Sequence, residues 1–311
     1  MLKASLNVWK SLWQIHMNKQ GITFLIASKN QGDEINDVIK RCFNQKFTGN
    51  IEVILIDDKS SDKTQEIGET IAKKEKNLIV MSTKGEGRVK GLNKAIQKSK
   101  NEFICLSAGD IFFEKYFAST ILSYFTEKNI AFVSPFSDTG GNATVWRKNV
   151  LKELNGFDEE FNEKGTGFRD DTDLAFRAFD KNYKGIFTYK TAKFKHEHSL
   201  KKEGLLDKLK YGWSRIKIHR FDPLLYKKHP IRGKEFFDVK LGFIRNPWKD
   251  FEVATGLWKG KFDFSSPQGI VLVKGNSIPN KILIALLGLG YVFLVKTSRL
   301  YGSIKYRKLL L

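Results

Sequence analysis

A regular alternation of two kinds of apolar segment between residues 22 and 136 is the strongest constraint on the fold of this chain. Short β-rich runs are separated by longer segments whose apolar residues recur at helical spacing. The short runs are 22–28, 51–57, 77–83, 102–107 and 130–136, and the helical segments are 34–45, 62–74, 88–100 and 115–128. Strands that alternate with helices of this length predict βαβ units and a parallel sheet.

The rhythm changes after residue 136. The sequence predicts a strand, a short helix and a turn over 140–161, a loop leading into a helix over 165–182, and two short strands over 183–200. Residues 201–250 are basic and aromatic and show few strong periods. We therefore expect an N-terminal amphipathic segment, a main domain and a basic C-terminal extension, bounded as 1–19, 20–220 and 221–311.

Polar side chains stand where the predicted strands end. They are Ser28, Asp57 and Asp58, Thr83, and the run from Ser107 to Asp110. Parallel α/β sheets bind ligands at the carboxyl ends of their strands, so chemistry is expected at this edge. The adjacent acids Asp57 and Asp58 can accept hydrogen bonds from a base and from ribose hydroxyls. Capping of the following helix is their structural alternative.

Four segments in sequence order resemble the family-2 glycosyltransferases of the GT-A fold. The segments are 21–67, 91–110 with its "SAGD" ending, 155–161 ("NGFDEEF") and 169–198 ("RDDTDL" to "KHEH"). The resemblance implies an α/β fold with a Rossmann-like, nucleotide-sugar-binding mixed sheet flanked by helices, followed by a basic, partly helical C-terminal extension. It also implies a nucleotide-sugar donor, UDP-linked by preference, and inversion at the anomeric carbon.

The resemblance assigns nucleotide-sugar binding to residues near the ends of three strands and on the third helix. These residues are Ala27, Ser28, Glu34, Asp57, Asp58, Asn93, Lys94, Ser107 and Gly109. Within this set Asp58 would contact the base edge, and Asn93 and Lys94 would lie beneath the diphosphate.

The string S-A-G-D at 107–110 aligns with the family's Asp-x-Asp metal motif, commonly written D-A-D-D. Ser107 and Gly109 replace two acids, as in members that carry N-S-G-D, and Asp110 remains. Mg²⁺ often takes one or two carboxylates together with substrate phosphates. His196 falls where the family can place a metal-ligating histidine, so Asp110 and His196 are expected to hold Mg²⁺ or Mn²⁺. A turn in which Asp110 only caps the next helix is the alternative.

The resemblance places Asp170 and Asp171 on the family's Glu-Asp pair. Sugar transfer needs a base for the acceptor hydroxyl, and Asp171 is assigned that role, with Asp170 orienting the acceptor or sharing the work. Arg177 is a candidate for the acceptor or diphosphate, although Asp173 and Arg177 at i, i+4 can also form a helix ion pair. The three acids also favour the helix dipole, which does not exclude catalysis.

The chain carries 54 Lys+Arg against 34 Asp+Glu, a formal net charge of +20. Such an excess suggests an anionic partner. The basic, aromatic stretch 208–230 offers Arg215 and Arg220 for a lipid diphosphate acceptor or the leaving group, and a solvated basic face is the alternative. Cys42 and Cys105 lie in apolar stretches and predict buried, reduced thiols in a cytoplasmic protein.

The uncharged apolar run 282–295 is shorter than the roughly 20 residues of a full membrane span. Lysines and arginines follow it, at Lys296, Arg299, Lys305, Arg307 and Lys308. This pattern favours an interfacial or re-entrant helix with a basic collar, and a buried helix that caps the core is nearly as well supported.

These features together predict a hexose-transferring enzyme of envelope polysaccharide synthesis, peripheral at the inner face of the cytoplasmic membrane. Its acceptor is expected to be a glycan or a lipid-linked molecule. A GT-A-like protein that binds nucleotide or glycan without catalysis is the alternative, motivated by the altered metal motif. Nucleic acid is not an expected partner, because the charge is not accompanied by any nucleic-acid motif.

Overall fold

The structure, a computed structural model, describes residues 21–163, 166–188, 191–196, 204–245, 251 and 278–311. The chain divides into two compact units, Met1–Glu197 and His198–Leu311. The predicted domain boundary at residue 220 therefore lies inside the second unit. The predicted amphipathic segment 1–19 lies outside the described residues.

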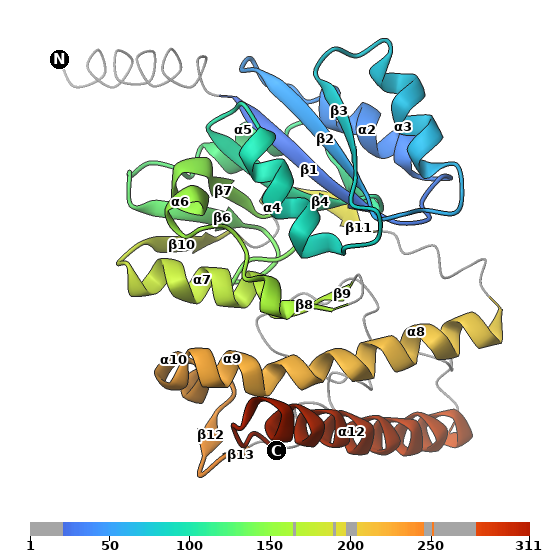
Figure 1. The fold of residues 1–311 in the computed structure, drawn as a ribbon, viewed down its shortest axis with the longest axis vertical. Coiled ribbons are helices and arrows are strands. Elements are labelled where there is room, and N and C mark those ends of the chain that lie inside the picture. Colours follow the sequence, from blue (N-terminus) through green and yellow to red (C-terminus); the bar gives the residue numbers. More distant parts are fainter. Residues whose placement is uncertain (1–20, 164–165, 189–190, 197–203, 246–250, 252–277) are drawn as a thin grey trace. The chain divides into compact units, whose positions relative to one another are not determined.

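The first unit is built on a seven-stranded sheet of order β10-β6-β7-β4-β1-β2-β3 (Figure 1). Its strands are β1 Ile22–Ser28, β2 Ile51–Asp57, β3 Leu78–Ser82, β4 Phe103–Ala108, β6 Ile130–Ser134, β7 Val145–Arg147 and β10 Lys184–Phe187. Strand β7 runs antiparallel to both of its neighbours, and the other pairs are parallel. The sheet is therefore mixed rather than wholly parallel.

Helices cover both faces of this sheet, so its central strands read as nearly continuous apolar runs. Helices α2 Ile35–Phe43, α3 Thr64–Ala72 and α5 Phe117–Leu122 pack on one face, and α4 Arg88–Lys98, α6 Lys148–Glu153 and α7 Asp170–Asp180 pack on the other. Successive side chains of a strand alternate between faces. In β1, accordingly, Phe24 and Ile26 join the first core and Leu25 joins the second.

Two short strand pairs complete the first unit, and the sequence predicted one of their four strands, the second of the two expected over 183–200. Strand β5 Ile111–Phe113 pairs antiparallel with β11 Phe194–His196. After the 3₁₀ turn η1 Glu159–Phe161, the two-residue strands β8 Asn162–Glu163 and β9 Thr166–Gly167 form a second antiparallel pair. Both pairs lie close to polar residues at the carboxyl edge of the sheet, as described below.

The second unit is mainly helical where the structure describes it. Its elements are α8 Leu205–Lys217, η3 Ile218–Phe221, α9 Asp222–Lys228, α10 Pro230–Phe236, β12 Val239–Lys240, β13 Phe243–Ile244 and α12 Ile278–Tyr306. The weak periodicity of 201–250 did not predict these helices. A buried ion pair joins Arg299 of α12 to Asp222 of α9 at 2.9 Å, so Arg299, expected in a basic collar, faces inward instead.

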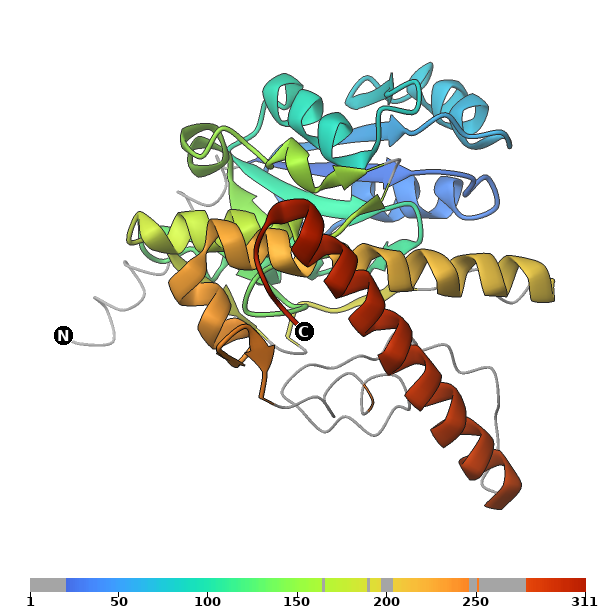
Figure 2. The ribbon, with the colours of Figure 1, turned by 60° about the horizontal axis from the view of Figure 1, so that its bottom comes forward.

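Helix α12 extends beyond the predicted run 282–295 at both ends. Its second half packs on η3 and α9, and Figure 2 shows its first half extending away from them. Ile282, Leu286, Leu289 and Phe293 are exposed along one side of that half. Within the described part of the chain, no helix is both long enough and apolar enough to cross a membrane.

Candidate active site

Parallel register brings the strand-end polar residues to one level of the sheet. Ser28 pairs with Asp57 across β1 and β2, and Ala27 pairs with Ala108 across β1 and β4. The next residue, Asp58, donates its backbone N–H to the Ser28 carbonyl at 2.9 Å. The carboxyl ends of β1, β2 and β4 therefore form one edge, as the alternation of strands and helices predicted.

The two acids at the end of β2 are buried and only partly satisfied. Asp58 Oδ1 accepts hydrogen bonds from the Gly87 backbone N–H at 3.0 Å and from the Thr83 hydroxyl. Among the described residues, Asp58 Oδ2 and Asp57 Oδ1 have no hydrogen-bond partner, and the Lys29 ammonium lies 3.8 Å from Asp58 Oδ2. A buried carboxylate oxygen left unsatisfied is costly, so these two atoms are well suited to a polar ligand.

Gly109 allows the end of β4 to pack against the start of the loop after β1. A Cβ at this position would lie 2.2 Å from Gln31 Oε1 and 2.6 Å from Ser28 Oγ, which are both closer than real contacts allow. The Ser28 hydroxyl donates to Gln31 Oε1 at 3.0 Å. The space that an acid would need at position 109 is therefore filled by Gln31 and Ser28.

Asp110 and His196 meet because of strand pairing. In the antiparallel β5–β11 pair, His196 lies opposite Ile111, which directly follows Asp110. His196 Nε2 lies 3.3 Å from Asp110 Oδ2, and each side chain is only 8% exposed. Tertiary structure thus brings together the two residues that the sequence assigned to a metal.

This pair fits a divalent cation that the substrate helps to coordinate. A carboxylate oxygen and an imidazole nitrogen are both metal donors, and they stand within contact distance of each other in a nearly buried place. Among the described residues no group of three or more His, Cys, Asp or Glu side chains could hold a metal. Substrate phosphate oxygens could supply further ligands, as is common for Mg²⁺.

The acids at the start of α7 are held in different ways. Asp170 is 2% exposed and forms an ion pair with Arg88, the first residue of α4, at 2.5 Å. Asp171 Oδ1 accepts the Thr172 backbone N–H at 2.8 Å, and its Cβ lies 3.9 Å from where a Cβ on Gly140 would stand. Asp170 is thus committed to a guanidinium, whereas Asp171 lies beside a glycine of the loop after β6.

The pKa of Asp171 is raised from 3.8 to about 6. Burial is the largest cause, and the neighbouring charge of Asp170 adds to it. The charges of Arg88 and Arg169 and the hydrogen bond from Thr172 act in the opposite direction. A carboxylate with such a pKa is ionised at neutral pH and is a stronger base than an ordinary aspartate, which suits proton abstraction.

Arg177, Asn93 and Lys94 make contacts within the protein. The Arg177 guanidinium donates to Asp173, to the Leu154 carbonyl and to the Gly156 carbonyl, which confirms the expected i, i+4 ion pair. Asn93 exchanges two hydrogen bonds with the backbone of Phe157, and the exposed Lys94 pairs with Glu86. Their roles in binding a diphosphate or acceptor stay predictions.

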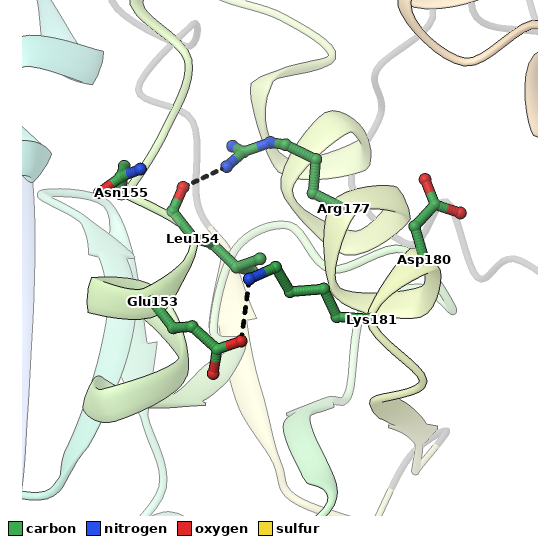
Figure 3. Close-up of a pocket in the computed structure, with 6 residues that line it drawn as sticks. All are labelled: Glu153, Leu154, Asn155, Arg177, Asp180 and Lys181. Carbon is green, nitrogen blue, oxygen red and sulfur yellow. Dashed lines mark hydrogen bonds and ion pairs between the residues drawn. The ribbon is translucent and has the colours of Figure 1, made fainter.

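Figure 3 shows a hollow of about 340 Å³ between the ends of α6 and α7. Its lining residues are Glu153, Leu154, Asn155, Arg177, Asp180 and Lys181. Asp180 and Lys181 lie at the opposite end of α7 from Asp171. This hollow is therefore separate from the strand-end acids.

The remaining predicted site residues occupy varied places. Ala27 and Ser107 lie in β1 and β4 at the carboxyl edge, and Glu34 directly precedes α2. Arg215 lies in α8 and Arg220 in η3, both in the second unit. Their roles in binding substrate also stay predictions.

Sequence reasoning missed Arg88 and Gln31. An arginine in the first turn of a helix that has no acid there opposes the helix dipole, and this conflict could have pointed to Arg88. No comparable signal marks Gln31, because its place beside Gly109 depends on the loop after β1 folding back over β4.

The chain belongs to the family described as Glycosyl transferase family 2, whose sequence model matches residues 23–187. This match spans just over half of the chain and includes the strand-end acids and the start of α7. The predicted enzyme class, a glycosyltransferase, is thereby confirmed.

Individual relatives are more distant. The chain is 32% identical over 93 residues to poly-beta-1,6-N-acetyl-D-glucosamine synthase of Staphylococcus aureus strain MSSA476, a match that covers 30% of this chain and 22% of the relative. The chain is 29% identical over 97 residues to the synthase of the same name from Staphylococcus epidermidis, covering 31% of this chain and 23% of that one. The matched part thus spans less than a quarter of these relatives.

Among solved structures, the fold resembles the mannosyltransferase PcManGT from Pyrobaculum calidifontis, solved with GDP-Man and Mn²⁺. The TM-score is 0.62 at 15% sequence identity, and the match covers 91% of this chain and 88% of that one. The predicted GT-A fold, a mixed sheet flanked by helices, is confirmed.

Proposed function

We propose that this protein is an inverting glycosyltransferase that moves a sugar from a nucleoside diphosphate, UDP by preference, to a hydroxyl of a glycan or lipid-linked acceptor. Family membership supports transfer of a sugar, and the names of the staphylococcal relatives support a product in envelope polysaccharide synthesis. In this proposal the unsatisfied oxygens of Asp57 and Asp58 receive the nucleoside.

The transfer itself is a single displacement. The acceptor O–H gives its proton to the Asp171 carboxylate, the oxygen forms a bond to the anomeric carbon, and the bond from that carbon to the diphosphate oxygen breaks. The nucleoside diphosphate leaves with the bonding electrons, and the anomeric configuration inverts. Mg²⁺ or Mn²⁺, held by Asp110 and His196 together with the diphosphate, would stabilise negative charge on the leaving group.

The observation that carries this proposal is the environment of Asp171. It lies in the first turn of α7, next to Asp170, which forms an ion pair with Arg88. Arg88 directly follows Gly87, whose backbone N–H donates a hydrogen bond to Asp58. Its pKa of about 6 leaves it ionised at neutral pH. The proposed base Asp171 and the proposed nucleoside ligand Asp58 are thus connected through Gly87, in the turn before α4, and Arg88, the first residue of α4.

We further propose that the enzyme works on the inner face of the cytoplasmic membrane and that α12 contacts anionic lipid there. The exposed Ile282, Leu286, Leu289 and Phe293 supply an apolar strip, and the chain carries no acidic residue after Asp263. Interfacial helices bind membranes by burying apolar side chains among the lipids and by attraction of their basic residues to anionic lipid headgroups. In a flotation assay with vesicles that contain 30% anionic phospholipid, the wild-type protein should float with the vesicles, whereas the Leu286→Glu variant should not.

The test of function begins with donor binding. A panel of UDP- and GDP-linked sugars, with and without Mn²⁺, should include one donor that raises the melting temperature, because a ligand of the native state stabilises it by mass action. Release of nucleoside diphosphate from that donor should then require Asp171. Matched variants are Asp171→Asn and Asp180→Asn, the latter at the exposed end of the same helix.

Three outcomes separate the possibilities. Donor stabilisation with release that Asp171→Asn abolishes supports a transferase. Donor stabilisation without any release from wild type supports a binding protein without catalysis. Failure of every nucleotide and nucleotide sugar to stabilise the protein refutes the proposed function.

A further inference from the structure

Arg88 occupies a position that its own helix disfavours. It is the first residue of α4, where a positive charge opposes the helix dipole, and the first turn of α4 contains no acid to offset it. Its guanidinium nitrogen Nη1 instead lies 2.5 Å from Asp170 Oδ2, on a helix 82 residues further along the chain. The side chain of Asp170 is 3% exposed and that of Arg88 is 26% exposed, so the carboxylate is buried and the guanidinium is partly open to solvent.

The surroundings fix the pair in place. A Cβ on Gly167 would lie 3.0 Å from Arg88 Nη1 and 3.1 Å from both carboxylate oxygens of Asp170, so the pair packs directly on the backbone of β9. Asn162 of β8 donates from Nδ2 to the Glu86 carbonyl at 2.8 Å, which holds the turn before α4. The β8–β9 pair thus contacts both the ion pair, through Gly167, and the turn before Arg88, through Asn162.

Arg88 and Asp170 act on Asp171 in opposite directions. The charge of Asp170 raises the pKa of Asp171, and the charge of Arg88 lowers it. Arg169, before α7, also lowers it, and the loop that packs against Asp171 presents Gly140 and the exposed Asp138. Burial lowers the pKa of Arg88, but the charges of Asp170 and Asp171 outweigh it and raise that pKa, so Arg88 stays cationic.

We propose that Arg88 is a positioning residue that commits Asp170 to an ion pair and leaves Asp171 as the single base for the acceptor hydroxyl. The inference rests on the proposed function and resolves the choice between two adjacent acids that the sequence left open. Arg88 also follows Gly87, whose N–H binds Asp58 at 3.0 Å, so the same turn holds an acid of the donor site and the partner of the base.

The proposal predicts opposite effects for the two partners. Arg88→Met removes a charge that lowers the pKa of Asp171, so the ascending limb of kcat/KM should move to higher pH by about one unit. Asp170→Asn removes a charge that raises this pKa and releases Arg88, so the limb should move to lower pH. Arg88→Lys keeps the charge and should restore most of the wild-type profile. Lys98→Met changes an exposed residue in the last turn of α4 and should leave the ascending limb of kcat/KM at its wild-type pH.

A second measurement does not depend on turnover. The full chain is labelled with ¹³C-carboxyl aspartate, and the Asp171 signal is assigned by its loss in Asp171→Asn. Its titration should move up in Arg88→Met and down in Asp170→Asn.

The outcomes distinguish this inference from the proposed function. Shifts in the same direction, or no shift in either variant, would overturn the role of Arg88. An Arg88→Met variant with a raised donor KM but an unchanged pH limb would also overturn it, because Arg88 would then be a donor ligand. If the two variants show the predicted titration shifts but the wild type turns over no nucleotide sugar, the proposed function is refuted while the charge arrangement is supported.

Discussion

Replacing Asp171 with Asn should make the protein more stable and far less active. Asn keeps the shape of the side chain and an oxygen that can accept the Thr172 N–H, which Asp171 Oδ1 accepts at 2.8 Å. It removes a carboxylate whose charged form is disfavoured by burial and by Asp170. The stability change should therefore depend on pH in a direction that the structure fixes.

The magnitude follows from the pKa of Asp171. The rise from 3.8 to about 6 means that the native state binds this proton more tightly than the unfolded chain does. The stability that this proton contributes is complete below about pH 4 and is lost as the pH rises through about 6. At about 1.4 kcal/mol per pKa unit, the full effect is roughly 3 kcal/mol, of which about 1.4 kcal/mol is lost between pH 5 and pH 8.

Urea or thermal unfolding of wild type and Asp171→Asn at pH 5, 6, 7 and 8 measures this effect. The stability advantage of the variant should grow by about 1.4 kcal/mol from pH 5 to pH 8, or about 3–6 °C in melting temperature for a unit of this size. Asp180→Asn, exposed on the same helix, should change stability by less than about 0.5 kcal/mol at every pH. A gap between wild type and Asp171→Asn that is independent of pH, or a less stable variant at pH 8, would refute the reasoning. Turnover of the variant should fall by roughly 10²–10⁴-fold, the usual contribution of a general base.

Gly109→Ala should weaken donor-induced thermal stabilisation and cost about 1 kcal/mol of stability or less, because its Cβ would displace the movable side-chain ends Gln31 Oε1 and Ser28 Oγ, which stand 2.2 Å and 2.6 Å from that position. Adding Gln31→Ala should recover part of that loss, and a strictly additive double variant would contradict the packing explanation. Arg299→Met should cost about 2–3 kcal/mol in urea unfolding, because the fully buried Asp222 loses its guanidinium partner at 2.9 Å and keeps only the neighbouring His219 ring nitrogen, 3.0 Å from the same carboxylate oxygen. A loss below 1 kcal/mol, about that of an exposed ion pair, would show that the Arg299 pair is exposed in solution.

The strands and helices of residues 22–136 were predictable because each carries its own periodic signal. The structure has β1 at Ile22–Ser28 and β2 at Ile51–Asp57, the bounds that the apolar runs indicate. The strand expected within 140–161 is β7, but its antiparallel place in the main sheet was not predicted. The three-residue β5 was not predicted, because a strand so short carries too little periodicity. Their pairing depends on neighbours that are distant in sequence.

The second unit was harder to predict for another reason. The apolar spacing of α8, α9 and α10 is interrupted by many basic residues, and among the described residues these helices pack against neighbours such as η3, β12 and α12 that are separate elements of the chain. Arg299 illustrates the difficulty. It follows an apolar run and reads as a surface charge, yet it turns inward because Asp222 is buried on α9.

The sequence alone determined the α/β alternation and the placement of acids after particular strands, because periodicity and chain order are local properties that folding does not alter. It also fixed which residue types stand at positions 57, 58, 110, 170 and 171. Tertiary structure alone decided their partners. The pairing of β5 with β11 sets His196 beside Asp110, and the fold brings the first residue of α4, Arg88, into an ion pair with the first residue of α7, Asp170. These contacts join residues 86 positions apart in the case of Asp110 and His196 and 82 positions apart in the case of Arg88 and Asp170, and their geometry depends on the whole sheet and on the burial that the assembled core provides.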